Sequence, residues 1–355
     1  MVTLYVMSME PFAGKTVLCL GIARKMAGEG LSVGYIRPLT QAAPQLESAR
    51  SCAAVMKRSL GLMEPMDVLN PVTINAESLE AIFSGRAGNL HQKVTDAFRL
   101  ASSGKDVMMA EGVSGLAEGS MVGLDAQSTA ELLDAKALLV LRGKSETIGD
   151  QAMVAKKRLG ERLMGVVVNA VPQSRMEFVS ETLTGFLASK GIKVYAVLPE
   201  DRLLSSVSVG ELVERLNGRV IVGQEHMDHL VENVMVGAMS VENALKYFRR
   251  KPNKVVITGG DRPDIQILAL ETSTKCLILT GNLEPSPMIL GRAEELNVPV
   301  VLVSHDTLGA VNAVEQAFLE VQFYDEKKNR RFEQMLETSL DYGSLRHDLG
   351  LGPRE

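Results

Sequence analysis

The segment Ser8-Met9-Glu10-Pro11-Phe12-Ala13-Gly14-Lys15-Thr16 lies between two elements that are easy to recognise. The apolar run Leu4 to Met7 precedes it and predicts a buried strand, and the segment Thr16 to Gly28 after it predicts a helix. A loop in this position directs main-chain N–H groups toward one point, where the helix dipole also favours an anion. The segment therefore predicts a phosphate-binding loop.

Residue types within this loop suit a nucleotide. Lys15 can reach the β and γ phosphate oxygens, the Thr16 hydroxyl can ligate Mg²⁺, and Gly14 permits close approach of the backbone. Met9 stands where the usual Gly-x-x-x-x-Gly-Lys-Thr pattern has its first glycine, and the alternative is a chance Gly-Lys-Thr at a helix start. The expected nucleotide contacts in the loop are Ser8, Ala13, Gly14, Lys15, Thr16 and Val17.

Short apolar runs continue to alternate with helix-length segments after the loop. Such alternation is typical of a parallel sheet covered by helices on both faces, the α/β class. The expected strands are Leu4 to Met7, Val33 to Ile36, Val107 to Ala110, Ala137 to Leu141, Met164 to Val168 and Val194 to Leu198. The expected helices include Thr16 to Gly28, Ala49 to Leu60, Ile148 to Leu159 and Glu177 to Lys190.

The alternation pauses around Asp201 to Asn217 and then resumes with shorter elements. A chain of 355 residues has room for two domains. We therefore expect a first domain at 1–216, a second, smaller α/β domain at 217–323, and a charged helical tail at 324–355. The tail is interpreted as solvated or as a dimer contact.

Composition excludes several classes of protein. Hydrophobic residues make up 46% and charged residues 23%, so a disordered chain or a coiled-coil rod is not expected. Net charge is −5 with scattered Lys and Arg, which argues against a nucleic-acid partner. No apolar run approaches the ~18–20 residues that cross a bilayer, and no signal peptide is recognisable, so a cytoplasmic protein without a membrane partner is expected. The 3 cysteines have no metal-type spacing.

The loop and four further segments resemble those of dethiobiotin synthetase and its relatives, which have glycine at the Ser8 position. Gly34-Tyr35-Ile36-Arg37-Pro38 is similar to their second-strand motif, with Arg37 in place of the usual lysine. Glu111-Gly112-Val113-Ser114-Gly115 resembles their Glu-Gly segment. Asn169 resembles their base-reading asparagine, and Leu198-Pro199-Glu200 their loop around the nucleobase.

The resemblance implies a role for each of these residues. Glu111 would hold Mg²⁺ together with Thr16, and Arg37 would clamp a carboxylate or a phosphate. Asn169 would read adenine, with Pro199 and Glu200 beside the base. The structural alternatives are a turn carboxylate for Glu111, a turn asparagine for Asn169 and a surface arginine for Arg37.

The segment Asn253 to Asp264, which contains Gly259-Gly260-Asp261-Arg262, is similar to the signature of the DRTGG domain. Together the two halves look like the N-terminal region of long bacterial phosphotransacetylases. The acetyl-transferring domain of those enzymes is missing here, so phosphotransacetylase activity is not expected. Arg262 and Asp261 are candidates for an anionic ligand at a helix start, although capping alone explains the aspartate.

One departure from the first family limits the functional expectation. Its relatives have a metal-site aspartate where this chain has Cys52, and Glu47 is the nearby acidic alternative. Since a thiol is not a hard anionic ligand, we expect a nucleotide-responsive regulatory module with weak or no turnover. The alternative is an ATP-dependent ligase or ATPase that phosphorylates a carboxylate or carbamate. Either function implies ATP, with GTP as an alternative, and Mg²⁺; a homodimer and a small carboxylate or anionic effector are also expected.

Overall fold

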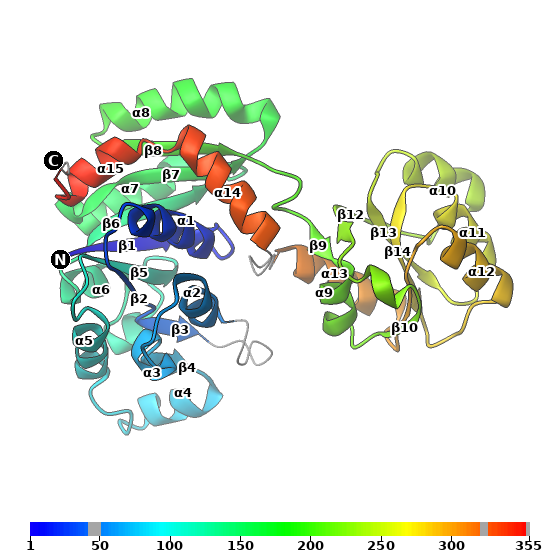
Figure 1. The fold of residues 1–355 in the computed structure, drawn as a ribbon, viewed down its shortest axis with the longest axis horizontal. Coiled ribbons are helices and arrows are strands. Elements are labelled where there is room, and N and C mark those ends of the chain that lie inside the picture. The colour runs from blue at the N-terminus through cyan, green and yellow to red at the C-terminus, as the bar shows by residue number, and fades with distance from the viewer. Residues whose placement is uncertain (42–50, 320–325, 353–355) are drawn as a thin grey trace. The chain divides into compact units, whose positions relative to one another are not determined.

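The computed structural model of the chain describes residues 1–41, 51–319 and 326–352. They form two compact units, both drawn in Figure 1. One unit comprises Met1–Glu200 and Phe323–Glu355, and the other comprises Asp201–Gln322. The second unit is therefore an insertion between two parts of the first.

This division falls earlier in the chain than the boundary expected near Leu216. Val207, Val209 and Leu212 are buried, together with Leu216, in one cluster with core strand residues such as Ile257 of the second unit. Residues 207–216 thus contribute to the second core. The pause in the sequence pattern at Asp201 marks the division better than the short helix that follows it.

A parallel sheet forms the centre of the first unit, with the strand order β2-β5-β1-β6-β7-β8. The loop that follows β1 leaves from the middle of this sheet, because β1 pairs with β5 on one side and with β6 on the other. The strands are β1 (Val2–Ser8), β2 (Val33–Ile36), β5 (Val107–Ser114), β6 (Lys136–Arg142), β7 (Leu163–Val171) and β8 (Lys193–Pro199). Each contains one of the apolar runs expected to be a strand.

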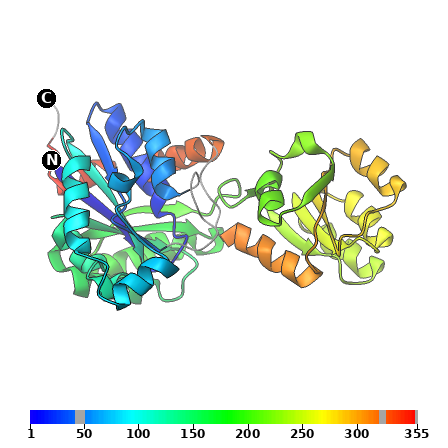
Figure 2. The same ribbon diagram turned by 90° about the horizontal axis from the view of Figure 1, so that it is seen from below.

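Helices cover both faces of this sheet, as Figure 2 shows. On one face lie α1 (Lys15–Gly28), α14 (Glu326–Ser339) and α15 (Tyr342–Leu349). On the other lie α5 (Leu90–Ala101), α6 (Ala126–Leu132), α7 (Ile148–Leu159) and α8 (Thr184–Ser189), the last preceded by a π-helical segment at Phe178–Leu183. Short 3₁₀ turns occur at Ser120–Val122, Gly160–Arg162 and Gln173–Arg175.

Besides the helix expected at Ala49 to Leu60, the connection between β2 and β5 contains small elements that the sequence pattern did not predict. β3 (Leu39–Gln41) and β4 (Val72–Ile74) pair in parallel outside the main sheet. The helices of this connection that precede α5 are α2 (Cys52–Leu60), α3 (Met66–Leu69) and α4 (Ala76–Phe83). The helix expected from residue 49 begins at Cys52 among the described residues, and residues 49 and 50 lie outside them.

The helices α14 and α15 pack on the first unit, alongside α1 and β8 (Figure 1). The side chains of Phe332, Leu336 and Leu345 are buried. Helix α14 lies so close to α1 that a Cβ added to Gly21 would be 2.4 Å from a methyl carbon of Leu336. A solvated tail is therefore wrong for these helices, because their apolar side chains complete the covering layer over one face of the sheet.

The second unit has a smaller sheet with the strand order β10-β15-β14-β13-β12. It is parallel except at β10, which runs antiparallel to β15. Its strands are β10 (Arg219–Val222), β12 (Asn233–Val236), β13 (Lys254–Gly259), β14 (Thr274–Thr280) and β15 (Val300–Leu302), and β9 (Val207–Ser208) pairs separately with β11 (Leu230–Val231). Its helices are α9 (Val209–Arg215), α10 (Val241–Phe248), α11 (Pro263–Leu270), α12 (Pro287–Glu295) and α13 (Thr307–Leu319), with a 3₁₀ turn at Gln224–His226.

These observations confirm the α/β class and the presence of a second, smaller α/β unit. Strands of the first sheet are apolar on both faces because helices cover both, which is why they read as continuous apolar runs. No helix among the described residues has the length and apolar character needed to cross a membrane.

Candidate functional site

The loop after β1 has a backbone conformation that requires glycine at one position. Gly14 has φ of 97°, in the left-handed region, and a Cβ on it would be 2.3 Å from the Asn169 side-chain nitrogen. Gly14 also precedes α1 directly, and the helix start has no side-chain cap. Since the first N–H groups of a helix lack partners within the helix, the start of α1 can accept an anion.

Lys15 is the buried cation of this loop. Its Nζ donates to Ser8 Oγ at 2.9 Å and to Ser114 Oγ at 2.8 Å, and the residue is 7% exposed. Ser8 Oγ in turn donates to the Glu10 carbonyl at 2.6 Å. Burial lowers the pKa of Lys15. The ammonium group is thus held by neutral hydroxyls, which an anionic ligand could replace.

Glu111 accepts hydrogen bonds from three donors in the carboxyl-terminal half of β5. Its Oε1 accepts from Thr16 Oγ1 at 2.7 Å and from Arg37 Nη1 at 3.1 Å, and its Oε2 accepts from Tyr35 OH at 2.9 Å. The carboxylate is 1% exposed. Both oxygens are therefore used within the protein, and Glu111 connects the phosphate loop to β2.

Tyr35 and Ser114 received no role from the sequence. Side chains alternate along a strand, so Tyr35 and Arg37 point to the same side, and this signal could have placed Tyr35 beside Glu111. Pairing of β1 with β5 aligns Ser8 with Ser114, which brings both hydroxyls to Lys15. Ser114 could be predicted only once that register is known.

Cys52 lies beside Thr16, with its Sγ 3.3 Å from Thr16 Oγ1. It is the first residue of α2, and the Ser51 side chain caps the helix by accepting from the Ala54 N–H. Burial raises the pKa of the Cys52 thiol, with the nearby Glu111 carboxylate acting in the same direction. The group next to Thr16 is therefore a neutral thiol. Glu47 lies outside the described residues.

These residues do not fit a magnesium ion well. Mg²⁺ prefers hard oxygen ligands in octahedral geometry. Thr16 and Glu111 would supply two, but they are hydrogen-bonded to each other and Arg37 places a positive charge on the same carboxylate. Across the described ranges, no group of three or more His, Cys, Asp and Glu side chains could hold a metal ion.

Asn169 and Glu200 lie at the carboxyl ends of β7 and β8, as expected. Both side chains, however, are bound to other groups of the protein. The Asn169 amide donates to the Ala13 carbonyl at 2.9 Å and accepts from the Ala170 N–H at 2.9 Å. Glu200, which follows Pro199, pairs with Lys144 at 2.6 Å. Asn169 therefore holds the phosphate loop.

Structure thus brings together most of the expected site around the carboxyl ends of the strands. The residues linked there by hydrogen bonds or close packing are Ser8, Ala13, Gly14, Lys15, Thr16, Arg37, Glu111 and Asn169. Val17 is buried in α1 and offers its main chain only. Pro199 and Glu200 lie at β8, three strands away from β1, past β6 and β7.

The expected second site follows β13. Arg262 forms a two-pronged ion pair with Asp264, with distances of 3.1 Å and 3.0 Å, and also donates to the Met239 carbonyl. This pairing raises the pKa of Arg262 and lowers that of Asp264. The Arg262 guanidinium is thus occupied by a neighbour within its own helix start, and Asp261 precedes it in the turn.

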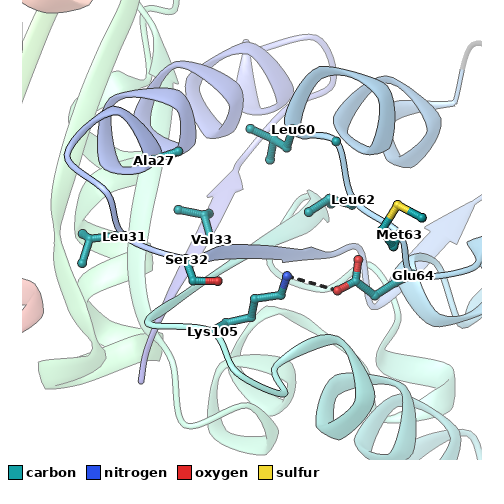
Figure 3. Close-up of a pocket in the computed structure, with 10 residues that line it drawn as sticks. Ala27, Leu31, Ser32, Val33, Leu60, Leu62, Met63, Glu64 and Lys105 are labelled. Atoms are coloured by element: carbon teal, nitrogen blue, oxygen red, sulfur yellow. Dashed lines mark ion pairs between the residues drawn. The ribbon is translucent and has the colours of Figure 1, made fainter.

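A cavity of about 290 Å³ lies in the first unit, at the other end of the sheet (Figure 3). Val33, where β2 begins, contributes to its wall, and the Lys105 and Glu64 side chains point toward each other across it with an ion pair of 3.2 Å. Arg37 follows the opposite end of β2. The cavity is therefore separate from the phosphate loop.

Residues 2–208 match the model of a family described as an AAA domain. The chain belongs to this AAA domain family. Residues 211–317 match the DRTGG domain. The protein therefore consists of a P-loop NTPase domain followed by a DRTGG domain, which confirms the resemblance seen in the sequence.

Curated relatives of this AAA domain protein include phosphate acetyltransferases. That of Synechocystis sp. is 24% identical, over 99% of this chain and 53% of the relative, and that of Pseudomonas aeruginosa is 23% identical, over 96% and 51%. The chain spans about half the length of these relatives. A cobalt-dependent inorganic pyrophosphatase from Clostridium perfringens is 28% identical over 41% of this chain and 27% of the relative.

Solved structures with some likeness include MinD from Aquifex aeolicus, a cell division protein. It is 17% identical with a TM-score of 0.38, over 57% of this chain and 84% of that chain. The CBS and DRTGG domains of the Clostridium perfringens pyrophosphatase, complexed with diadenosine tetraphosphate, are 20% identical with a TM-score of 0.30, over 50% and 90%. At these scores the likeness carries no argument about function.

Proposed function

We propose that the first unit binds ATP at the loop before α1, and that the protein is a nucleotide-responsive regulatory module with weak or no turnover. The observation that carries this proposal is Lys15, a buried ammonium group at a helix start that donates hydrogen bonds to two hydroxyls. A buried cation that is hydrogen-bonded to no anion costs free energy, and a phosphate in the loop would accept hydrogen bonds from it. Family membership supports a nucleotide as the ligand.

Weak turnover follows from the groups around the loop. Phosphoryl transfer relies on cations that stabilise the developing charge and on a group that positions the nucleophile. Glu111 has both oxygens bound by protein donors, and Cys52 stands where the resemblance implies a carboxylate. We assign no step to Mg²⁺, for which Thr16 and Glu111 are poorly arranged.

A regulatory role is supported by the DRTGG domain in this chain and by the greater length of its relatives. The phosphate acetyltransferases that match this chain are about twice as long, so the matching half accompanies a further part in those proteins. In this proposal the DRTGG domain responds to the nucleotide, an anionic effector binds near Asp261 and Arg262, and the protein is a cytoplasmic homodimer. For that effector to bind, Arg262 would have to leave Asp264.

One observation favours an ATP-dependent ligase as a second candidate. The Arg37 Nε is buried and has no hydrogen-bond partner among the described residues. A guanidinium with one unpartnered N–H beside a phosphate loop could orient an acceptor carboxylate for phosphorylation. GTP in place of ATP remains the alternative nucleotide for either function.

Calorimetry with the full chain tests the proposal. ATP should bind to the wild type, and Lys15→Ala should lose about 2–5 kcal/mol of binding free energy, because a cation is removed from a desolvated phosphate contact. Lys156→Ala, which removes a lysine from a surface ion pair in α7, is the matched control. Unchanged affinity in a folded Lys15→Ala protein would exclude the loop as the nucleotide site. Turnover faster than ~1 per second would favour the ligase or ATPase instead.

A further inference from the structure

We infer that this site binds its nucleotide without a divalent cation, and that the Arg37 guanidinium provides the positive charge that a metal would supply. The inference rests on the proposed function, because it requires a nucleotide at the loop that contains Lys15. It adds a property of that site, namely indifference to Mg²⁺, and names Arg37 as the residue responsible.

The first argument concerns the oxygens that a metal would need. Glu111 Oε1 accepts two hydrogen bonds, from Thr16 and from Arg37, and Oε2 accepts one from Tyr35. A metal bound to Thr16 and Glu111 would break the 2.7 Å hydrogen bond between them. It would also lie beside a guanidinium 3.1 Å from the same carboxylate oxygen, and like charges repel most strongly where water is excluded.

The second argument concerns the remaining ligands. Mg²⁺ takes oxygen ligands and binds sulfur poorly. Beside the Thr16 hydroxyl, at 3.3 Å, lies the thiol of Cys52. In the part of the chain that the structure describes, no third acidic or histidine side chain joins Glu111 and Cys52 to make a metal site.

The third argument concerns charge and donors for phosphate. Lys15 and Arg37 supply two positive charges around one buried carboxylate, Glu111. Arg37 uses Nη1 for Glu111, while its Nε is buried and unpartnered among the described residues. The guanidinium carries five N–H donors in a planar fork that matches phosphate oxygens. A nucleotide can therefore find here a fixed cation with directed donors.

The test compares ATP binding to the full chain in EDTA and in excess Mg²⁺ by calorimetry. The wild-type Kd should differ by no more than threefold between the two buffers, or be weaker with Mg²⁺. Wild-type binding that is tenfold or more tighter with Mg²⁺ would overturn this inference and leave the proposed function standing. Absence of ATP binding in both buffers would overturn both.

Substitutions of Cys52 test the ligand argument. Cys52→Asp adds an anionic oxygen beside Thr16 and should make binding at least tenfold tighter with Mg²⁺ than in EDTA. Cys52→Ala, the matched control, removes the sulfur without adding charge and should keep the small difference of the wild type. If Cys52→Asp shows no response to Mg²⁺ while Cys52→Ala does, the placement of the metal position is wrong.

Substitutions of Arg37 test the charge argument. Arg37→Gln should weaken ATP binding in EDTA by at least thirtyfold, and Mg²⁺ should recover part of that loss because the repelling charge is gone. Arg37→Lys keeps the charge and should lose less in EDTA than Arg37→Gln. Thermal melting of each variant checks that it is folded. An Arg37→Gln protein that is folded and binds as tightly as the wild type in EDTA would refute the inference.

Discussion

Lys15 and Lys254 are buried lysines, one in each unit, with different surroundings. Lys15 begins α1 and its ammonium group contacts two hydroxyls, with the buried carboxylate of Glu111 raising its pKa against the effect of burial. Lys254 begins β13, is fully buried, and donates to the Ser273 carbonyl at 3.0 Å. Its Nζ lies 5.8 Å from the centre of the Phe248 ring.

The difference lies in which end of the strands each lysine occupies. Ligands of α/β proteins bind outside the carboxyl ends of the strands, where loops and helix starts converge. Lys15 follows the carboxyl end of β1 and joins an array with Glu111 and Arg37, whereas Lys254 is at the amino end of β13. Burial of a lysine therefore indicates a binding site only when its neighbours can exchange their hydrogen bonds for a ligand.

The largest expected effect comes from removing the carboxylate near Lys15. Glu111→Leu leaves the donors of Arg37 and Tyr35 without a partner in a buried place, so the free energy of unfolding should fall by about 3–5 kcal/mol. Denaturant unfolding measures this. Glu80→Leu, in an exposed ion pair with Arg86, should cost less than about 1 kcal/mol. Equal losses in the two variants would contradict the role given to Glu111.

A smaller effect concerns Lys254 and pH. Burial lowers the pKa of Lys254 to about 8, whereas an unfolded lysine titrates near ~10.4. Charged Lys254 therefore destabilises the folded state. Its contribution to the free energy of unfolding of the wild type rises as the pH increases from about 8 to about 10.4. Lys254→Met should be more stable than the wild type by about 1–3 kcal/mol at pH 7, and this advantage should disappear by about pH 10.5.

Denaturant unfolding at pH 7, 9 and 10.5 checks this prediction. Lys251→Met, which replaces an exposed lysine nearby, is the control and should show no such trend. A Lys254→Met protein that is less stable than the wild type at pH 7 would mean that the hydrogen bond to Ser273 outweighs the cost of burying the charge. The two lysines would then be more alike than their surroundings suggest.

The smallest effect is expected at Asn169. Its amide holds the Ala13 carbonyl, so Asn169→Ala should loosen the phosphate loop and weaken binding of ATP and GTP alike, by about 0.5–1.5 kcal/mol. Competition binding with both nucleotides measures the two losses. A loss confined to ATP would instead support the reading of adenine that the sequence resemblance implied.

The fold could be predicted from the sequence where the pattern is local. The six apolar runs of the first unit are strands because burial on both faces leaves a strong signal. The burial of α14 could not be predicted from the sequence, because the helix begins with charged residues and its buried side chains, Phe332 and Leu336, come later. The pattern of apolar runs also does not indicate that β10 pairs with β15 in the antiparallel direction.

The candidate site could also be predicted only where its signal is local in the sequence. Lys15, Thr16 and Glu111 belong to segments whose residue types and order carry the signal. Tyr35 and Ser114 act through register between strands distant in sequence, and a single sequence does not specify such register. Occupation of Arg262 by Asp264 depends on side-chain geometry at a helix start, which residue identity alone leaves open.

The insertion of one unit into the other has a consequence for synthesis. When the ribosome has made residues 1–200, the sheet of the first unit can form, but α14 and α15 do not yet exist. The surface that Phe332, Leu336 and Leu345 later cover stays open until the whole second unit has been translated. Exposed apolar surface of this kind promotes aggregation of partly made chains. A shortened chain that stops at Glu200 should therefore need a chaperone or the separately supplied carboxy-terminal helices to remain in solution.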